Sequence, residues 1–514
     1  MSSGGAASTV VLQDAFSTVG HRSGGQDTTR HTFSSSPAAA RTLPKERRRQ
    51  RRRRWRPPYA GERKSSARMA IAVRSAAAAA AVARHSLRPP LAAPGSIRGA
   101  SLLPPQRARG VGPCRARARA ASSSATGGGG HLPPLFSVAP MMDWTDNHYR
   151  TLARLISKHA WLYTEMVVAE TIVHQKDNLD RFLAFPAEQH PIVLQIGGSN
   201  LDNLAKATEL ANAYSYDEIN LNCGCPSGKV AGHGCFGARL MFDPEFVGDA
   251  MSAIAANCNV PVSVKCRIGV DDRDSYEELC ELSSETSHVV SKSPTRHFII
   301  HARKALLSGL SPAENRNILF PGYHQYEYYF ALLRDFPDVQ FTLNGGITTI
   351  DQVTASIRQG AHRVMVGRAA YNNPWNMLGH VDSEVYGMLT RRSSRRQILE
   401  SYQVYGDSIM GQYGPSRPNV RQLVKPLLNL FHSEPGNGLW KRKADSTLRH
   451  CKTLESFLEE TLDAIPNSVL DAPIGKEAYI EEGHFADMDS LLPPRYSSLT
   501  NGSCEIPALV TAST

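Results

Sequence analysis

From residue 135 to residue 366 the chain repeats one pattern, in which a short apolar run is followed by a longer segment with helical spacing. The apolar runs are 136–139, 162–166, 192–196, 218–222, 262–266, 298–301, 341–344 and 363–366. Strands that alternate with helices favour a parallel sheet, and eight such units over about 240 residues predict an α/β fold of the (β/α)8 TIM barrel type. The alternative on pattern alone is a doubly wound open sheet.

Polar and special residues follow the apolar runs at the point where each run ends. In chain order they are Pro140-Met141-Met142, Glu165-Met166, Gln195, Asn222 with Cys225, Lys265 with Arg267, His301, Asn344-Gly345-Gly346 and Gly367-Arg368. Barrel enzymes take their active-site residues from the C-terminal ends of several strands. The sequence therefore predicts a single site at that end of the barrel.

The segments between the runs carry helix-start signals. Asp243 followed by Pro244 predicts an N-cap and a proline at the first helical position, which would open a helix over 245–256. Ser199 is expected to cap a helix over 201–213, and Thr348 or Thr349 a helix over 351–358.

After residue 374 the strand pattern stops. The segments 384–410, 420–433 and 445–464 predict amphipathic helices, so we expect a barrel over 132–380, a small all-α domain over 384–465 and a mobile tail over 470–514. A solvated helix face is the plain explanation for the basic residues here, and a polyanion site is the alternative. These residues are Arg391, Arg392, Arg395, Arg396, Arg417, Arg421, Lys425, Lys441, Arg442, Lys443 and Arg449.

Residues 1–130 differ from the rest in composition. They hold 24 Lys and Arg against 4 Asp and Glu, a net +20, which leaves −9 of the chain's +11 for the remaining residues. The segment is rich in Ser and Ala, and 69–130 contains nine arginines and no acid, as is typical of a disordered organellar transit peptide. We expect this segment to direct the protein to the chloroplast rather than to the mitochondrion. If the segment is not a functional transit peptide, we expect a cytoplasmic protein. The alternative is a nuclear or RNA-binding tract at 47–56.

Glycines at the ends of the last two predicted strands indicate a phosphate site. Asn344-Gly345-Gly346 ends the seventh strand and Gly367-Arg368 the eighth. Glycine lets backbone N–H groups approach a phosphate closely at this place in a barrel. Either glycine motif alone is common in turns, whereas the two together favour a bound phosphate group.

Gln195, Lys265 and His301 end three other strands and suit the polar edge of a flavin ring. A lysine here can stabilise negative charge near N1 of the reduced ring, although a lysine can also extend to solvent. The chain has no Gly-x-Gly-x-x-Gly after a first strand, so a mononucleotide such as FMN fits better than a dinucleotide.

Cys225 lies on a glycine-rich loop just after the fourth strand. A thiol with a pKa near about 8.5 is protonated at neutral pH and can act as a general acid. The alternative role is a buried apolar residue. Neither Cys223 nor Cys225 has a partner pair with zinc-site spacing, and no run of about 18 apolar residues occurs, so we expect no metal site and no membrane span.

Several segments together resemble the tRNA-dihydrouridine synthases, most closely the A-type, the tRNA-dihydrouridine(20/20a) synthases. The resemblance covers about 135–448, in order and with matching spacing. The segments are "FSVAPMMDWTD", "LYTEMV", "LQIGGSN", "YDEINLNCGCPSGKV", "FGARLM", "PVSVKCRIGVDD", "FIIHARKALLSGLSPAENR", "LNGGI" and "VMVGRAAYNNPW".

The resemblance implies an FMN-dependent barrel that reduces the C5–C6 double bond of a D-loop uridine in tRNA, with NADPH as the reductant. It assigns a proton-donor role to Cys225, and we expect a monomer with FMN at the C-terminal face of the barrel. By position, the FMN-binding residues would be Pro140, Met141, Met142, Gln195, Lys265, His301, Asn344, Gly345, Gly346, Gly367 and Arg368. Those that meet tRNA would be Asn222, Lys229, Arg303, Lys304, Asn315, Arg316, Arg421 and Lys425.

Two other functions compete with this reading. One is a flavin barrel that acts on a free pyrimidine, which would not need a basic helical domain. The other is a catalytically silent tRNA chaperone, which would not need Cys225 as an acid. Lys425 stands where the family pattern leads us to expect arginine, a better bidentate phosphate ligand.

Overall fold

The computed structural model describes residues 133–284, 287–307, 326–389, 392–414, 417–474 and 489–497. Among these residues, eight parallel strands close a barrel. In order around the ring they are β1 (Phe136–Val138), β2 (Trp161–Tyr163), β4 (Ile192–Gly197), β5 (Glu218–Cys223), β6 (Val262–Val270), β7 (His297–Ala305), β8 (Gln340–Asn344) and β9 (Val364–Val366). Because β1 pairs with both β2 and β9, and β2 pairs with β4, the ring is closed. The predicted (β/α)8 barrel is confirmed, and the open sheet is excluded.

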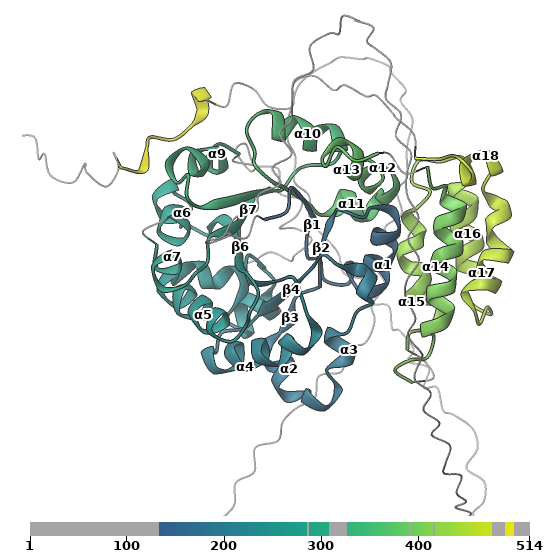
Figure 1. Cartoon of the computed structure of the whole chain (residues 1–514), viewed down its shortest axis with the longest axis horizontal. Helices are drawn as coiled ribbons and strands as arrows, with labels where there is room; N and C mark the ends of the chain where they lie inside the picture. The colour runs from purple at the N-terminus through teal and green to yellow at the C-terminus, as the bar shows by residue number, and fades with distance from the viewer. Residues whose placement is uncertain are drawn as a thin grey trace, which may run out of the picture. The chain divides into compact units, whose positions relative to one another are not determined.

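Helices surround this ring, as the view in Figure 1 shows. The short strand β3 (Val167–Val168) pairs with β4 beyond the end of β2. The helices are α1 (Asn147–Ile156), α2 (Ala169–His174), α3 (Asp180–Leu183), α4 (Leu201–Ala211), α5 (Pro244–Ala256), α6 (Tyr276–Ser283), α7 (His288–Lys292), α9 (Tyr326–Asp335), α10 (Ile350–Arg358), α11 (Arg368–Asn372), α12 (Pro374–Leu378) and α13 (Val381–Glu384).

Two of the predicted helix caps are confirmed, and one is displaced by a residue. The Asp243 side chain accepts the Phe246 N–H at the start of α5, and Thr349 caps α10. The prediction of Ser199 as the cap of α4 is wrong, because the Asn200 side chain accepts the Asn203 N–H instead. The Ser199 hydroxyl donates to the Gly234 carbonyl oxygen at 3.1 Å, toward the glycine-rich loop.

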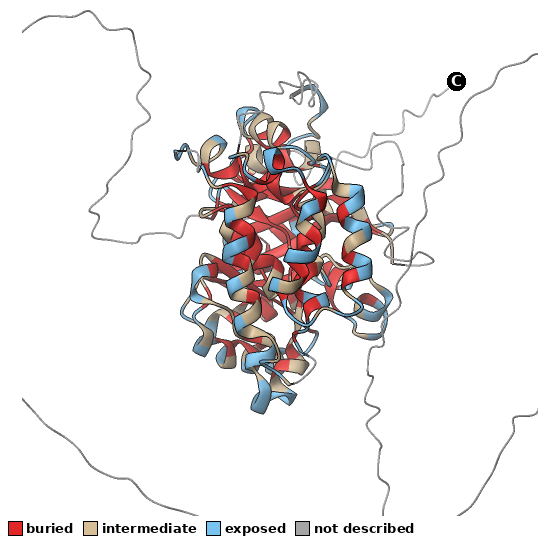
Figure 2. Ribbon diagram, turned by 90° about the vertical axis from the view of Figure 1, so that its right-hand side faces the viewer, coloured by how far each residue is buried: buried red, intermediate tan, exposed pale blue. Residues whose placement is uncertain are grey.

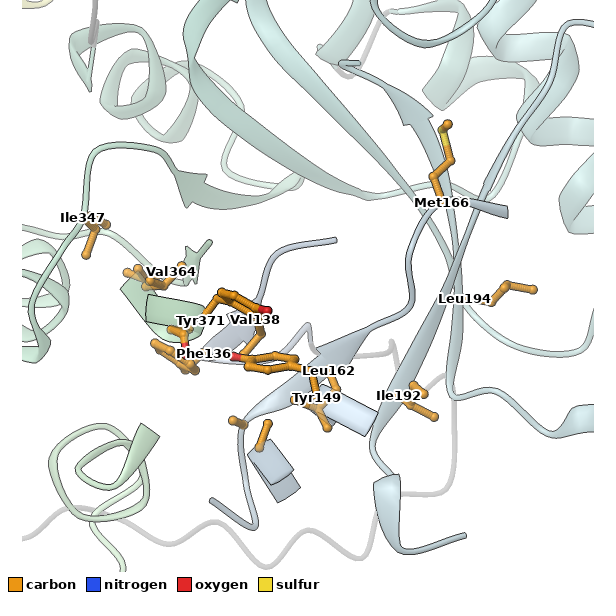
Figure 3. Close-up of a cluster of buried hydrophobic side chains, with 14 of the residues drawn as sticks. Phe136, Val138, Tyr149, Leu162, Met166, Ile192, Leu194, Ile347, Val364 and Tyr371 are labelled. Atoms are coloured by element: carbon orange, nitrogen blue, oxygen red, sulfur yellow. Dashed lines mark hydrogen bonds between the residues drawn. The ribbon is translucent and has the colours of Figure 1, made fainter. Parts of the chain in front are cut away.

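The apolar core lies mainly between the strands and the helices. Figure 2 shows that the strands and the inward faces of the helices are buried, whereas the outward faces are exposed. Figure 3 shows part of this layer, where Phe136 and Val138 of β1 meet Tyr149 of α1 and Tyr371 of α11. Burying one such large side chain contributes about 1.5–3 kcal/mol.

A bundle of helices follows the barrel, made of α14 (Arg395–Ile409), α15 (Val420–Val424), α16 (Asn437–Thr447), α17 (Leu454–Thr461) and α18 (Asn467–Leu470). Trp440 is fully buried in it, with the rings of Phe431 and Phe457 edge-on at 4.9 and 6.4 Å. The bundle lies beside α1 (Figure 1), where His148 Nδ1 is 3.1 Å from the Tyr405 hydroxyl.

Three predicted helix ranges are wrong in their bounds. The range 384–410 is interrupted because Gly387 adopts φ +65, and α14 starts only at Arg395, where the N-cap Ser394 forms a capping box with Gln397. The range 420–433 shortens to α15, since Pro426 follows and the chain tightens into a 3-10 turn over Lys425–Asn429. The range 445–464 is split, because α16 ends at Thr447 and Thr453 caps α17.

Part of the predicted mobile tail lies against α9. The Arg334 guanidinium donates to the Pro493 carbonyl oxygen at 3.0 Å, and the Tyr496 N–H donates to Asp335 at 3.1 Å. The Tyr496 ring meets Phe336 at 5.5 Å. Among the residues that the structure describes, no helix is long and apolar enough to cross a membrane.

Candidate active site

The inside of the barrel is lined by both apolar and polar side chains. Ala139, Tyr163, Val193, Ile299 and Met365 form a small inner cluster that joins strands from across the ring. Since side chains alternate along a strand, every second residue of each strand faces the same inner space. On β5 these inner residues are Glu218, Asn220 and Asn222, all buried.

Lys265 lies at the C-terminal end of this inner surface. Its side chain is 9% exposed, and its Nζ donates to Asn344 Oδ1 at 2.9 Å. Asn344 in turn donates to the Met365 carbonyl oxygen at 2.8 Å. Burial, and then the nearby Arg267 charge, lower the pKa of Lys265 to about 7. A lysine in this state gains its full charge when an anionic group binds beside it.

The glycines after β8 and β9 bring the backbone close to predicted site residues. Gly345 and Gly346 adopt φ +122 and +71, and a Cβ on Gly345 would lie 2.9 Å from the His301 ring. A Cβ on Gly367 would lie 3.4 Å from the Met141 sulfur. The structure therefore gathers His301 with Gly345 and Met141 with Gly367.

Other predicted cofactor residues are less enclosed. Pro140 is half-buried beside Met141, whereas Met142 is 56% exposed. Arg368 is exposed at the start of α11. Gln195, by contrast, is fully enclosed: it is 1% exposed and lies within the inner surface.

The Cys225 loop is tied to the barrel by hydrogen bonds from both sides. Asn222 Oδ1 accepts the backbone N–H groups of Gly224 and Cys225, each at 3.0 Å. Asn222 Nδ2 donates to Gln195 Oε1 at 2.8 Å. On the other side, Arg267 Nε donates to the Gly224 carbonyl oxygen at 2.6 Å. These bonds fix Cys225 at the C-terminal end of β5.

The glycine-rich stretch after Cys225 folds back onto it. Gly237 adopts φ +68, and a Cβ there would lie 2.7 Å from the Cys225 carbonyl oxygen. The Ala238 N–H donates to that oxygen at 3.0 Å. Burial raises the pKa of the Cys225 thiol, although the Ser227 N–H, Arg267 and Lys265 oppose the shift. The thiol therefore stays protonated at neutral pH and can donate a proton.

The residues expected to meet tRNA are in different settings. Lys229 and Arg421 are exposed, while Arg303 is buried. Lys304 Nζ is 2.6 Å from Asp274, and Lys425 Nζ donates to the Asp143 carbonyl oxygen. Asn315 and Arg316 lie outside the described residues.

One residue of the basic cluster has a structural role instead. Arg395 is 3% exposed, donates to the Val469 carbonyl oxygen, and forms an ion pair with Glu434. Its guanidinium lies 4.4 Å from the Trp375 ring centre. The prediction that Arg395 belongs to a polyanion-binding surface is therefore wrong, because its guanidinium is buried and paired within the protein.

The sequence did not predict a role for the inner residues Glu218, Asn220 and Ser263, or that Arg267 holds the Cys225 loop. For Glu218 and Asn220 the signal is the polar residue at every second position of β5, a pattern that an apolar buried strand would not have, whereas Ser263 and Arg267 lie on β6. Among the described residues, no group of three or more His, Cys, Asp or Glu side chains could hold a metal ion.

Comparisons with known proteins agree on one family. A family model described as Dihydrouridine synthase (Dus) matches residues 137–468. Proteins named tRNA-dihydrouridine(20/20a) synthase are similar over most of their length. The Shigella flexneri protein is 42% identical over 335 residues, 65% of this chain and 94% of that protein. The Vibrio cholerae protein is 40% identical over 330 residues, 64% and 96% of the two chains. The Escherichia coli K12 protein is 42% identical over 335 residues, 65% and 92%.

A solved structure titled as a 2-naphthoyl-CoA reductase complex has a TM-score of 0.37 and 8% identity, covering 49% of this chain and 50% of that one.

Proposed function

The chain belongs to the dihydrouridine synthase family, and we propose that it reduces the C5–C6 double bond of uridines 20 and 20a in the D-loop of tRNA, with FMN as cofactor and NADPH as reductant. The names of the relatives support this substrate. The observation that carries the proposal is the position of Cys225 just after β5, where Asn222 and Arg267 hold its loop at the C-terminal end of the barrel.

The residues at this end of the barrel fit a flavin mononucleotide. Lys265 is a buried amine whose hydrogen bond goes to a neutral amide, so an anionic ring edge beside it would favour its charged form. Gly345 and Gly346 have positive φ, and the backbone there has no side chain between it and a phosphate. Lys265, Gln195 and His301 would hold the ring, and the glycines with Arg368 would hold the phosphate.

When bound and reduced, the flavin would supply a hydride to C6 of the uracil. The protein supplies the rest of the reaction. Cys225 Sγ–H donates a proton to C5, and the bonds from Asn222 and Arg267 to its loop hold the thiol in place. Lys265 would stabilise negative charge at the edge of a reduced ring. A uridine must leave its stack to reach this site, as in other enzymes that act on a base.

The tRNA itself would be held by phosphate contacts at the rim and on the bundle. Lys229 on the glycine-rich loop and Arg421 at the start of α15 are exposed and can meet phosphates. We also propose that Asn315 and Arg316 contact the tRNA, as the family resemblance implies. The rest of the chain beyond residue 130 carries net −9, so recognition rests on local basic patches rather than on overall charge.

The test is to incubate the full chain with NADPH and an unmodified tRNA transcript, and to map dihydrouridine by position. Dihydrouridine at positions 20 and 20a supports the proposal. Oxidation of NADPH with the tRNA left intact, and reduction of a free pyrimidine instead, would assign the barrel to small-molecule chemistry.

A further inference from the structure

Glu218 places a carboxylate inside the barrel, and the reaction described above does not use it. The residue has no exposed surface. Ser263 Oγ donates to its Oε1, Tyr163 donates to the same oxygen at 3.4 Å, and His297 Nδ1 lies 3.6 Å from its Oε2. Burial, and then Glu218, raise the pKa of Tyr163 well above its ordinary value, so the phenol remains a donor.

A chain of hydrogen bonds leads from Glu218 toward the active site. Ser263 Oγ accepts from Asn220 Nδ2 at 2.8 Å, and Asn220 Oδ1 accepts from Gln195 Nε2 at 2.7 Å. Gln195, Asn220 and Ser263 are direct neighbours across β4, β5 and β6 in the strand register. Their side chains therefore meet without an intervening group.

The same chain ends at the catalytic loop. Gln195 Oε1 accepts from Asn222 Nδ2, and Asn222 Oδ1 accepts the N–H groups of Gly224 and Cys225. A continuous path of side-chain hydrogen bonds thus joins the buried carboxylate to the backbone of Cys225.

Both ends of this path have a fixed polarity. A carboxylate only accepts hydrogen bonds, and a backbone N–H only donates them. Every link between them donates in the direction of Glu218. An amide turned over by 180° would set donor against donor and acceptor against acceptor, so the two ends decide which atom each amide presents.

We propose that Glu218 is a positioning residue for uridine reduction: it fixes the amide orientations of Gln195 and Asn222, and through them the flavin edge and the Cys225 loop. This inference rests on the proposed function, because the flavin beside Gln195 and the uracil beside Asn222 are part of that proposal. Glu218 touches neither ligand and acts through Ser263 and Asn220.

The test compares two serine-to-alanine variants of the full chain. Ser263→Ala cuts the path between Glu218 and Asn220. Ser137→Ala is the matched control, since Ser137 also has no exposed surface and lies on the barrel-facing side of β1. In the part of the chain that the structure describes, the Ser137 hydroxyl has no hydrogen-bond partner. Three properties are measured: the FMN dissociation constant, the midpoint potential of the bound flavin, and the rate at which tRNA reoxidises the reduced flavin.

Ser263→Ala is expected to raise the FMN dissociation constant about tenfold, because a buried amide loses its acceptor. It should also shift the potential and slow reoxidation by tRNA more than reduction by NADPH. Ser137→Ala should stay within about twofold of wild type in each. Equal behaviour of the two variants would overturn the inference, while a wild type that makes no dihydrouridine would instead overturn the proposed function.

A second pair of variants covers the case in which Ser263→Ala does not fold. Asn220→Asp leaves Ser263 between two carboxylates, only one of which its proton can reach. Adding Glu218→Gln reverses both hydrogen bonds at Ser263: the new amide donates to the Ser263 hydroxyl, which donates to the carboxylate at position 220. The hydrogen bond from Gln195 to position 220 stays the same. The double variant should recover most of the FMN affinity that Asn220→Asp loses. A double variant no better than Asn220→Asp would contradict the assigned polarity.

Discussion

Burial shifts the pKa values of Cys225 and Lys265 in opposite directions. Burial raises the pKa of the Cys225 thiol and keeps its proton available, while it lowers the pKa of Lys265 to about 7. An acid that holds its proton and a lysine that gains charge beside an anion suit a reaction in which a reduced ring gives up a hydride and a carbon receives a proton.

Cys225→Ala removes the proposed proton donor and little side-chain volume. We expect the variant to bind FMN and tRNA as wild type does, and to reduce uridine roughly 10²–10⁴-fold more slowly, the usual contribution of a positioned acid. Single-turnover formation of dihydrouridine measures this. Cys223→Ala is the control, because that thiol is buried in the strand. Normal turnover by Cys225→Ala would show that another group supplies the proton.

Lys265 predicts a pH dependence of stability in the protein without cofactor. Its pKa is about 7 when folded, against about 10.4 for an unfolded lysine. Between these values the unfolded chain binds one more proton at this site, so the free energy of unfolding rises with pH, by up to about 1.4 kcal/mol per pH unit. Lys265→Met should remove that rise. Urea unfolding of both proteins at several pH values above 7 measures it, and parallel curves would refute the assignment.

Individual elements differ in how far the sequence predicts them. The strands of the barrel and the caps at Asp243 and Thr349 follow from local patterns, because alternation and capping act over a few residues. The bundle segments were correctly predicted as helices, but their predicted ends are wrong, since Gly387 and Pro426 interrupt an amphipathic pattern that continues past them. The placement of the glycines after β8 and β9, and of Cys225 after β5, follows from the sequence pattern, while their roles in a site stay predictions.

Roles that depend on strand register were not predictable. Ser263 reads as an ordinary strand residue, and only its place opposite Asn220 links it to Glu218 and to the catalytic loop. Arg395 reads as one of several surface arginines. Its burial follows from how α14 packs against Trp375 and the end of the bundle, which no local pattern records.

Within α14, Arg395→Ala is expected to destabilise the bundle rather than to weaken tRNA binding. It leaves Glu434 without its ion-pair partner and uncovers the Trp375 ring, at a cost of about 2–4 kcal/mol. Thermal unfolding measures the loss. Arg421→Ala, an exposed arginine on the neighbouring α15, is the matched control and should leave the unfolding midpoint unchanged.

The molecule as a whole joins a reducing barrel to a helical bundle through α1 and α14. His148 and Tyr405 meet across this boundary, and Lys425 donates to the backbone of Asp143 in the loop after β1. The bundle is thereby fixed beside the C-terminal end of β1, where the barrel would present the flavin. The proposed binding of tRNA to the bundle would place the D-loop over the site.

At this scale, Arg421→Ala should weaken tRNA binding severalfold and lower the slope of log affinity against log salt by less than one unit, because one phosphate contact is lost. Filter binding of unmodified tRNA over a range of salt concentrations measures both. FMN content should not change. An unaltered affinity and slope would move the RNA-binding surface away from α15.

The most direct test joins cofactor and substrate in one measurement. The full chain is reduced with NADPH without oxygen, freed of excess NADPH, and mixed with unmodified tRNA while the flavin absorbance is followed. We predict that tRNA reoxidises the flavin and that one dihydrouridine forms for each flavin reoxidised. A flavin that stays reduced with tRNA but is reoxidised by a free pyrimidine would contradict it.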